Sequence, residues 1–183
     1  MRKLLIENIL RHPKEFHWST QGLGMLRIYL AQHTRLHIWD RSLLVPGVSP
    51  VHTHPWDFKS TVVVGLMRNT RFIEASSGER WNRVLIKCGE DACTMGEPEQ
   101  ILMQEQLSEQ YREGDEYQQA STEIHLSHPE DGTVTIVERV FKPDTEHAYV
   151  YWRGKGAWVD AKPRPATPDE VQSVTQRALE TWF

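Results

Sequence analysis

The feature that most constrains this chain is a series of short segments rich in β-branched and aromatic residues. Such segments are typical of strands, because these side chains pack well on a pleated sheet. Turn residues separate several of them, at Pro46-Gly47, Ser77-Gly78, Gly89 and Asp131-Gly132. Strands this numerous, with no alternation of strands and helices, predict an all-β antiparallel sandwich or barrel. The strand-like segments are residues 25–31, 35–40, 60–66, 69–75, 83–88, 100–107 and 133–141.

Both ends of the chain have a helical pattern. Residues 2–11 carry apolar side chains at helical spacing, and Pro13 ends the pattern. Thr167 is followed by Pro168 and, three residues after itself, by Glu170, a capping box that predicts a helix over 168–182. We therefore expect a single domain over residues 1–183. Its barrel core would span residues 24–160 approximately, with the terminal helices packed outside.

The composition argues against several classes of protein. The 183 residues carry a net charge of −4 without a cluster of Lys and Arg, so we expect no nucleic-acid partner. No apolar run approaches the roughly 20 residues that span a bilayer, so we expect no membrane contact. The N-terminus lacks the long apolar stretch of a signal peptide, which favours a cytoplasmic location. Nine histidines and seven tryptophans indicate metal chemistry and a pocket lined with rings.

His52 and His54 are the first candidate site residues. They lie two positions apart in a segment that reads as extended, and side chains at i and i+2 of a strand point to the same side. Two imidazoles on one side can bind one metal ion, although a protein with nine histidines can also contain such a pair by chance. A second segment adds Gly114-Asp115 and, eleven residues after that glycine, His125.

With these residues the chain resembles the cupin superfamily. The family's first motif is matched by Gly47, His52, His54 and Gly65, and its second motif by Gly114, Asp115 and His125. The resemblance covers roughly residues 35–141. It implies a double-stranded β-helix, the cupin jelly-roll barrel, with one divalent metal ion held by His52, His54 and His125.

The chain departs from the cupin motifs at the acidic ligand. Phe58 and Lys59 stand where that ligand is expected, and Asp57 is one residue away, which on a strand turns a side chain to the other face. Asp57 is therefore only a candidate fourth ligand. Three imidazoles suit Fe(II), which we favour, while Zn, Ni, Mn or Cu are alternatives. The three-histidine set is also similar to that of thiol dioxygenases, but their Ser-x-His-x-Tyr strand is replaced here by residues 134–139.

These features predict a metal-dependent enzyme, in the first place a non-haem iron dioxygenase acting on a small organic substrate. Candidate substrate-binding residues are Arg68, Arg139 and Tyr117: an inward arginine would suit an anionic substrate, whereas an outward one would lie on a solvated face. His37 reads as a core histidine with its hydrogen bonds satisfied. No residue is assigned a catalytic role.

Two other functions remain open from the sequence. A non-catalytic or regulatory cupin would bind a small ligand, and a metal-dependent isomerase or hydrolase could use the same three histidines. Because many cupins pair through exposed strands, a homodimer is a candidate assembly.

Overall fold

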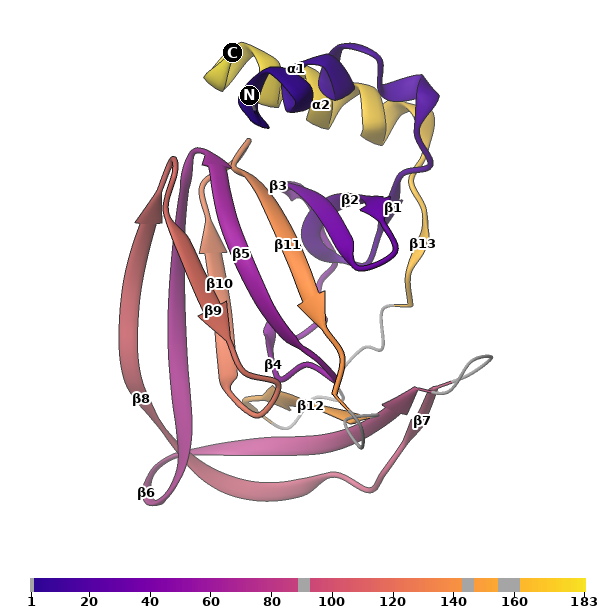
Figure 1. Ribbon diagram of the computed structural model, residues 1–183. Coiled ribbons are helices and arrows are strands. Elements are labelled where there is room, and N and C mark those ends of the chain that lie inside the picture. The colour runs from indigo at the N-terminus through magenta and orange to yellow at the C-terminus, as the bar shows by residue number, and fades with distance from the viewer. Residues whose placement is uncertain (1, 89–92, 143–146, 155–161) are drawn as a thin grey trace.

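The structure of the chain, a computed structural model, describes residues 2–88, 93–142, 147–154 and 162–183. It is mostly β, with antiparallel sheets and one α-helix at each end of the chain (Figure 1). The elements are α1 Arg2–Arg11, a 3-10 turn at Pro13–Glu15, β1 Ser19–Thr20, β2 Leu23–Ala31, β3 Thr34–Leu44, β4 Val51–His52, β5 Asp57–Val64, β6 Leu66–Cys88, β7 Cys93–Met95, β8 Glu99–Arg112, β9 Glu116–Gln119, β10 Ile124–Pro129, β11 Val134–Val140, β12 His147–Trp152, β13 Arg164–Pro165 and α2 Pro168–Trp182.

The strands of the described residues form two antiparallel sheets. The seven-stranded sheet has the order β13-β1-β2-β3-β11-β5-β9. The second sheet has the order β10-β4-β12-β6-β7, and β8 pairs along β6. The all-β prediction is confirmed at this level.

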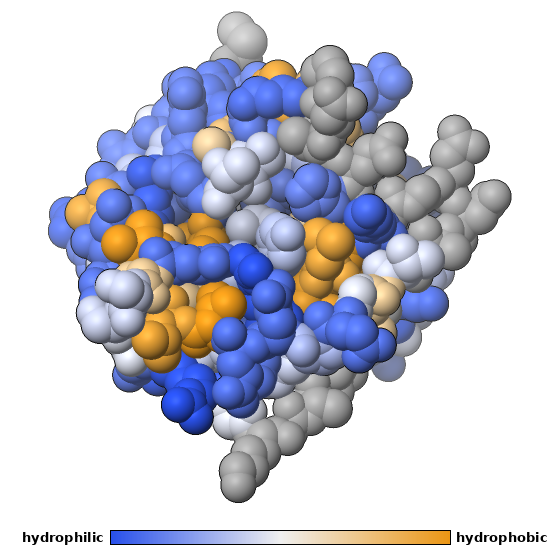
Figure 2. Space-filling model, turned by 90° about the horizontal axis from the view of Figure 1, so that it is seen from below, coloured by the Kyte–Doolittle hydropathy of each residue, from blue (hydrophilic) through white to orange (hydrophobic). Residues whose placement is uncertain are grey.

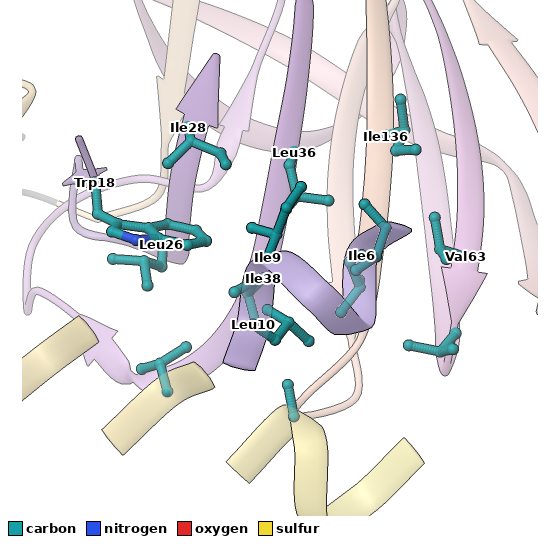
Figure 3. Close-up of a cluster of buried hydrophobic side chains, with 14 of the residues drawn as sticks. Ile6, Ile9, Leu10, Trp18, Leu26, Ile28, Leu36, Ile38, Val63 and Ile136 are labelled. Carbon is teal, nitrogen blue, oxygen red and sulfur yellow. The ribbon is translucent and has the colours of Figure 1, made fainter. Parts of the chain in front are cut away.

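Both helices lie where the sequence predicts them, and they pack on one face of the seven-stranded sheet. Thr167 caps α2 by accepting a hydrogen bond from the backbone N–H of Glu170, and the Glu170 side chain completes the capping box. Figure 3 shows the resulting core, in which aliphatic side chains of α1 meet those of the sheet. The core residues of β2, β3 and β11 that face the helices are Leu26, Ile28, Leu36, Ile38, Val134 and Ile136.

The opposite face of the seven-stranded sheet turns toward the second sheet. Because side chains alternate along a strand, the neighbours of the helix-facing residues point into this space. Phe58 of β5 and Tyr117 of β9 pack there in one cluster with Met67 of β6. The space between the sheets is therefore a second, largely aromatic core, and it contains the candidate site.

The prediction of a turn at Ser77-Gly78 is wrong. Both residues lie inside β6, a strand of 23 residues that bends sharply in Figure 1. Glu74 and Glu79 both pair with Met103 of β8, so the intervening residues of β6 bulge out while β8 continues. A bulge bends the bulged strand without ending its pairing, and the turn residues serve this purpose here.

The surface seen from below carries hydrophobic patches separated by hydrophilic residues (Figure 2). Apolar atoms contribute much of the accessible surface of folded proteins. In the described part of the chain, neither helix has the length and apolar character needed to cross a membrane.

Candidate metal centre

The three predicted histidines meet between β4 and β10. His52 is the last residue of β4, His54 lies two residues further on, and His125 is in β10. The two strands pair antiparallel with His125 directly opposite His52, and this register joins the two sequence motifs. One ring nitrogen of each histidine lies within 4.8 Å of the others. These three histidines lie close enough together to hold one metal ion.

Hydrogen bonds orient two of the three rings. The Nδ1 of His125 lies 2.9 Å from Asn69 Oδ1, and the Nδ1 of His52 lies 2.9 Å from the carbonyl oxygen of Pro50. Because both partners are oxygen acceptors, each Nδ1 carries the hydrogen and donates it. The Nε2 atoms then keep their lone pairs. Metal-binding histidines are commonly oriented in this way, by an oxygen that accepts from the other ring nitrogen.

The donor set of the site fits a divalent metal ion. The Nε2 atoms of His54 and His125 face each other at 2.9 Å. Since the Nε2 of His125 carries no hydrogen, this approach is favourable only if His54 donates a hydrogen bond or a cation lies between the two nitrogens. Three imidazoles that converge in this way match the nitrogen ligands of Zn, Cu, Ni and non-haem Fe sites.

The three imidazoles are held in the neutral form that binds metals. Burial lowers the pKa of His52 from its ordinary value of 6.5, because a charged ring loses its hydration. Burial also lowers the pKa of His54 and of His125, in both cases well below that value, and the neighbouring histidines lower it further. Near pH 7 no proton has to be displaced from these rings before a metal ion binds.

The histidines line a small cavity of about 60 Å³ between the two sheets. Trp56 stacks on His54 with the ring centroids 4.2 Å apart, and Phe58 meets the same imidazole edge-on at 5.1 Å. The cavity is far smaller than a site for a drug-sized ligand, which typically measures about 300–1,000 Å³. Its other lining residues are Leu23, Met25, His37, Trp39, Pro50, Ser60, Tyr117, Ser127, Thr135 and Val137.

Asp57, the candidate fourth ligand, is engaged elsewhere. Its Oδ1 accepts a hydrogen bond of 2.8 Å from the backbone N–H of Ser121, and its Oδ2 pairs with Lys142. The hydrogen bond from Lys142 is the main reason why the pKa of Asp57 lies below its ordinary value. Among the described residues, the ligand group at the site therefore consists of three histidines and includes no carboxylate.

The structure separates the candidate substrate-binding residues. Tyr117 is buried in the cavity wall, where its ring stacks on that of Tyr111 with centroids 4.4 Å apart. Arg68 is exposed on β6, opposite His128. Arg139 is half-buried on β11, and its guanidinium lies 5.7 Å from the centroid of the Trp56 ring. Tyr117 and Arg139 thus adjoin the histidine site, whereas Arg68 faces solvent.

Sequence patterns did not identify Asn69, and the prediction for His37 was wrong in part. Asn69 orients His125, although nothing in the sequence around it marks it as a site residue. His37 is buried, as predicted, but its hydrogen bonds are not satisfied: among the described residues neither ring nitrogen has a partner. Because His37 lines the same cavity as the three histidines, its imidazole is a polar group inside the cavity without a hydrogen-bond partner among the described residues.

Comparisons of the chain with protein-family models and with curated proteins gave no match. The geometry of the site is therefore the basis for the functional argument.

Proposed function

We propose that this chain is a cupin-type metalloenzyme that binds one divalent metal ion, Fe(II) in the first place, through His52, His54 and His125. The observation that carries the proposal is the convergence of three neutral imidazole nitrogens, within 4.8 Å of one another, in a cavity between two antiparallel sheets. Two antiparallel sheets that enclose the ligand residues also support a jelly-roll barrel.

The protein's own contribution to such a site is orientation and exclusion of water. Asn69 and Pro50 fix two rings, while Trp56 and Phe58 cover the third. A bound iron ion with three nitrogen ligands would retain open coordination positions and supply redox chemistry with O2. The small cavity favours a small organic substrate, or one end of a longer substrate.

Metal analysis tests the binding site directly. We expect about one metal ion per chain in the wild-type protein and a large loss in His52→Ala and His54→Ala. His128→Ala is the matched control, because His128 lies on β10 three residues after His125 but is exposed. Circular dichroism would establish that each variant is folded. Equal metal content in all folded variants would contradict the proposed site.

Oxygen consumption tests the reaction. The protein loaded with Fe(II) would be offered a panel of thiols, diketones and small acids, with the His52→Ala variant as the blank. We expect substrate-dependent consumption of O2 that the variant lacks. A protein that binds metal but consumes no O2 with any member of the panel would contradict the dioxygenase and leave the metal site standing.

A further inference from the structure

Three arginines gather beside the histidine site, on three neighbouring strands. Arg27 is on β2, Arg35 on β3 and Arg139 on β11. Arg27 pairs across the ladder with His37, and Arg35 pairs with Val137, and both of these partners line the cavity. The three arginines therefore share the face of the seven-stranded sheet that turns toward the second sheet.

Two aromatic rings bring the guanidinium groups of Arg35 and Arg139 together. They lie 4.8 and 5.2 Å from the centroid of the Tyr29 ring. They also lie 5.5 and 5.7 Å from the centroid of the Trp56 ring. Stacking of this kind leaves the edges of a guanidinium, which carry its N–H groups, free for an anion.

No carboxylate balances this charge within the described residues. Arg27 donates to Ser19 Oγ and to Gln21 Oε1, Arg35 donates to the Tyr29 hydroxyl, and Arg139 donates to the backbone oxygen of Gln32. None of these acceptors is a carboxylate; the Tyr29 phenol is the one ionisable group among them, and the charge and hydrogen bond of Arg35 lower its pKa. The Nε atoms of Arg35 and Arg139 are buried, and neither has a hydrogen-bond partner in the described part of the chain.

The electrostatic cost of the cluster is visible in its pKa values. Burial, followed by the charge of Arg35, lowers the pKa of Arg27 to about 10. The same two causes, in the same order, lower the pKa of Arg139. Like charges that are partly removed from water repel one another, and a bound anion would relieve this repulsion.

Trp56 and His37 connect the arginines to the histidine site. The Trp56 ring stacks on His54 and also contacts Arg35 and Arg139. His37 is 6% exposed and unpartnered among the described residues, and it lines the cavity together with His52, His54 and His125. Among the described residues that line the cavity there is no arginine, so the guanidinium groups adjoin the histidine site across the Trp56 ring.

We propose that Arg35 and Arg139, with Arg27 behind them, form an anion subsite that binds the carboxylate of a small organic acid next to the three-histidine site. A carboxylate fits because it is planar and compact and accepts two parallel hydrogen bonds from a guanidinium. That this acid is the substrate rests on the proposed function; the anion subsite itself does not.

Binding of butyrate, compared with its uncharged isostere butyramide, tests the subsite by NMR titration at constant ionic strength. We expect the wild-type protein to bind butyrate at least tenfold more tightly than butyramide. Arg35→Gln and Arg139→Gln should each weaken butyrate binding tenfold or more. Arg35→Lys keeps the charge without the fork and should fall between Arg35→Gln and the wild type.

Arg68→Gln is the matched control, because Arg68 is an exposed arginine on β6, a strand of the other sheet. We expect it to bind butyrate within twofold of the wild type. The His52→Ala variant should also retain binding, which separates the anion subsite from the metal site. Equal binding of butyrate and butyramide, or unchanged binding in folded Arg35→Gln and Arg139→Gln, would overturn the subsite whatever the metal content.

Discussion

Asn69 of β6 holds His125 of β10 in place through a hydrogen bond of 2.9 Å from His125 Nδ1 to Asn69 Oδ1. The orientation of the amide is set from its other end, where Asn69 Nδ2 donates to Gln119 Oε1 over 2.9 Å. Asn69 and Gln119 are each 1% exposed, so water cannot replace either partner. The position of the His125 ring thus depends on two side chains outside the histidine group.

Asn69→Ala should therefore weaken metal binding without removing a ligand. The buried His125 N–H and the Gln119 oxygen would both lose a partner, which typically costs about 1–3 kcal/mol each. Loss of an orienting partner of this kind typically lowers metal affinity about 10- to 100-fold. A metal titration checks this, with Gln118→Ala as the control because Gln118 is the exposed neighbour of Gln119. A metal affinity equal to that of the wild type would show that Asn69 does not orient the ligand.

Sequence patterns could predict the helices and the histidine group because the signals are local. The Thr167–Glu170 capping box fixes the start of α2 within a few residues. His52 and His54 are two apart in an extended segment, so their proximity follows from strand geometry alone. The match of His125 to the second cupin motif predicted the third histidine of the site. In the structure His125 reaches the other two because β10 pairs with β4, with His125 opposite His52.

The remaining features depend on pairing between distant strands. Asn69 reaches His125 only because β6 pairs with β10, and no local pattern encodes that register. Arg27 was missed because residues 24–28 of β2 are all buried, on both faces of the strand. Without an alternation of apolar and polar residues, the sequence does not indicate which face a charged side chain takes.

Gly65 and Gly114 have the same φ but different surroundings, which makes them a matched pair. Both have a φ of +90°, a region that favours glycine. A Cβ at Gly65 would lie 2.5 Å from Thr133 Oγ1, whereas a Cβ at Gly114 would meet nothing within 4 Å. Thr133 cannot easily yield, because its hydroxyl bonds both the N–H and the C=O of Leu66.

Gly114→Ala should lower the free energy of unfolding by the conformational cost alone, about 1–2 kcal/mol. Gly65→Ala should add the cost of overpacking, a further 1–3 kcal/mol approximately. Denaturation by urea at equilibrium measures both. If the two variants lose the same stability, the contact between Gly65 and Thr133 is not tight.

Leu10 and Leu4 test how the N-terminal helix is anchored. Leu10 is 1% exposed in the core between α1 and the sheet, while Leu4 is 71% exposed on the same helix. Leu10→Ala should lower the free energy of unfolding by about 2–5 kcal/mol, through lost burial and the cavity left behind. Leu4→Ala removes the same atoms from the surface and should change it by less than about 0.5 kcal/mol. Similar losses in urea denaturation would contradict the packing of α1.

The ion pair between Arg164 and Glu170 should make the C-terminal helix sensitive to acid. Hydrogen bonds from Arg164, aided by the backbone N–H of Thr167, lower the pKa of Glu170 from 4.5 to about 2. A carboxylate with a lowered pKa stabilises the folded state fully above its unfolded pKa, and this contribution is lost as the pH falls. The window for Glu170 therefore runs from about pH 4.5 down to about pH 2.

Glu170→Gln should be less stable than the wild type at pH 7, and the difference should shrink as the pH falls toward 2. The variant cannot form the ion pair, so acid removes no stabilising contribution at this position. Glu180→Gln is the control, because Glu180 is an exposed residue of the same helix whose carboxylate accepts from Gln176. Urea denaturation at pH 7, 5 and 3 gives the free energy of unfolding of the wild type and of both variants as a function of pH. If the free energies of unfolding of Glu170→Gln and of the wild type differ by the same amount at every pH, the lowered pKa of Glu170 does not contribute to stability.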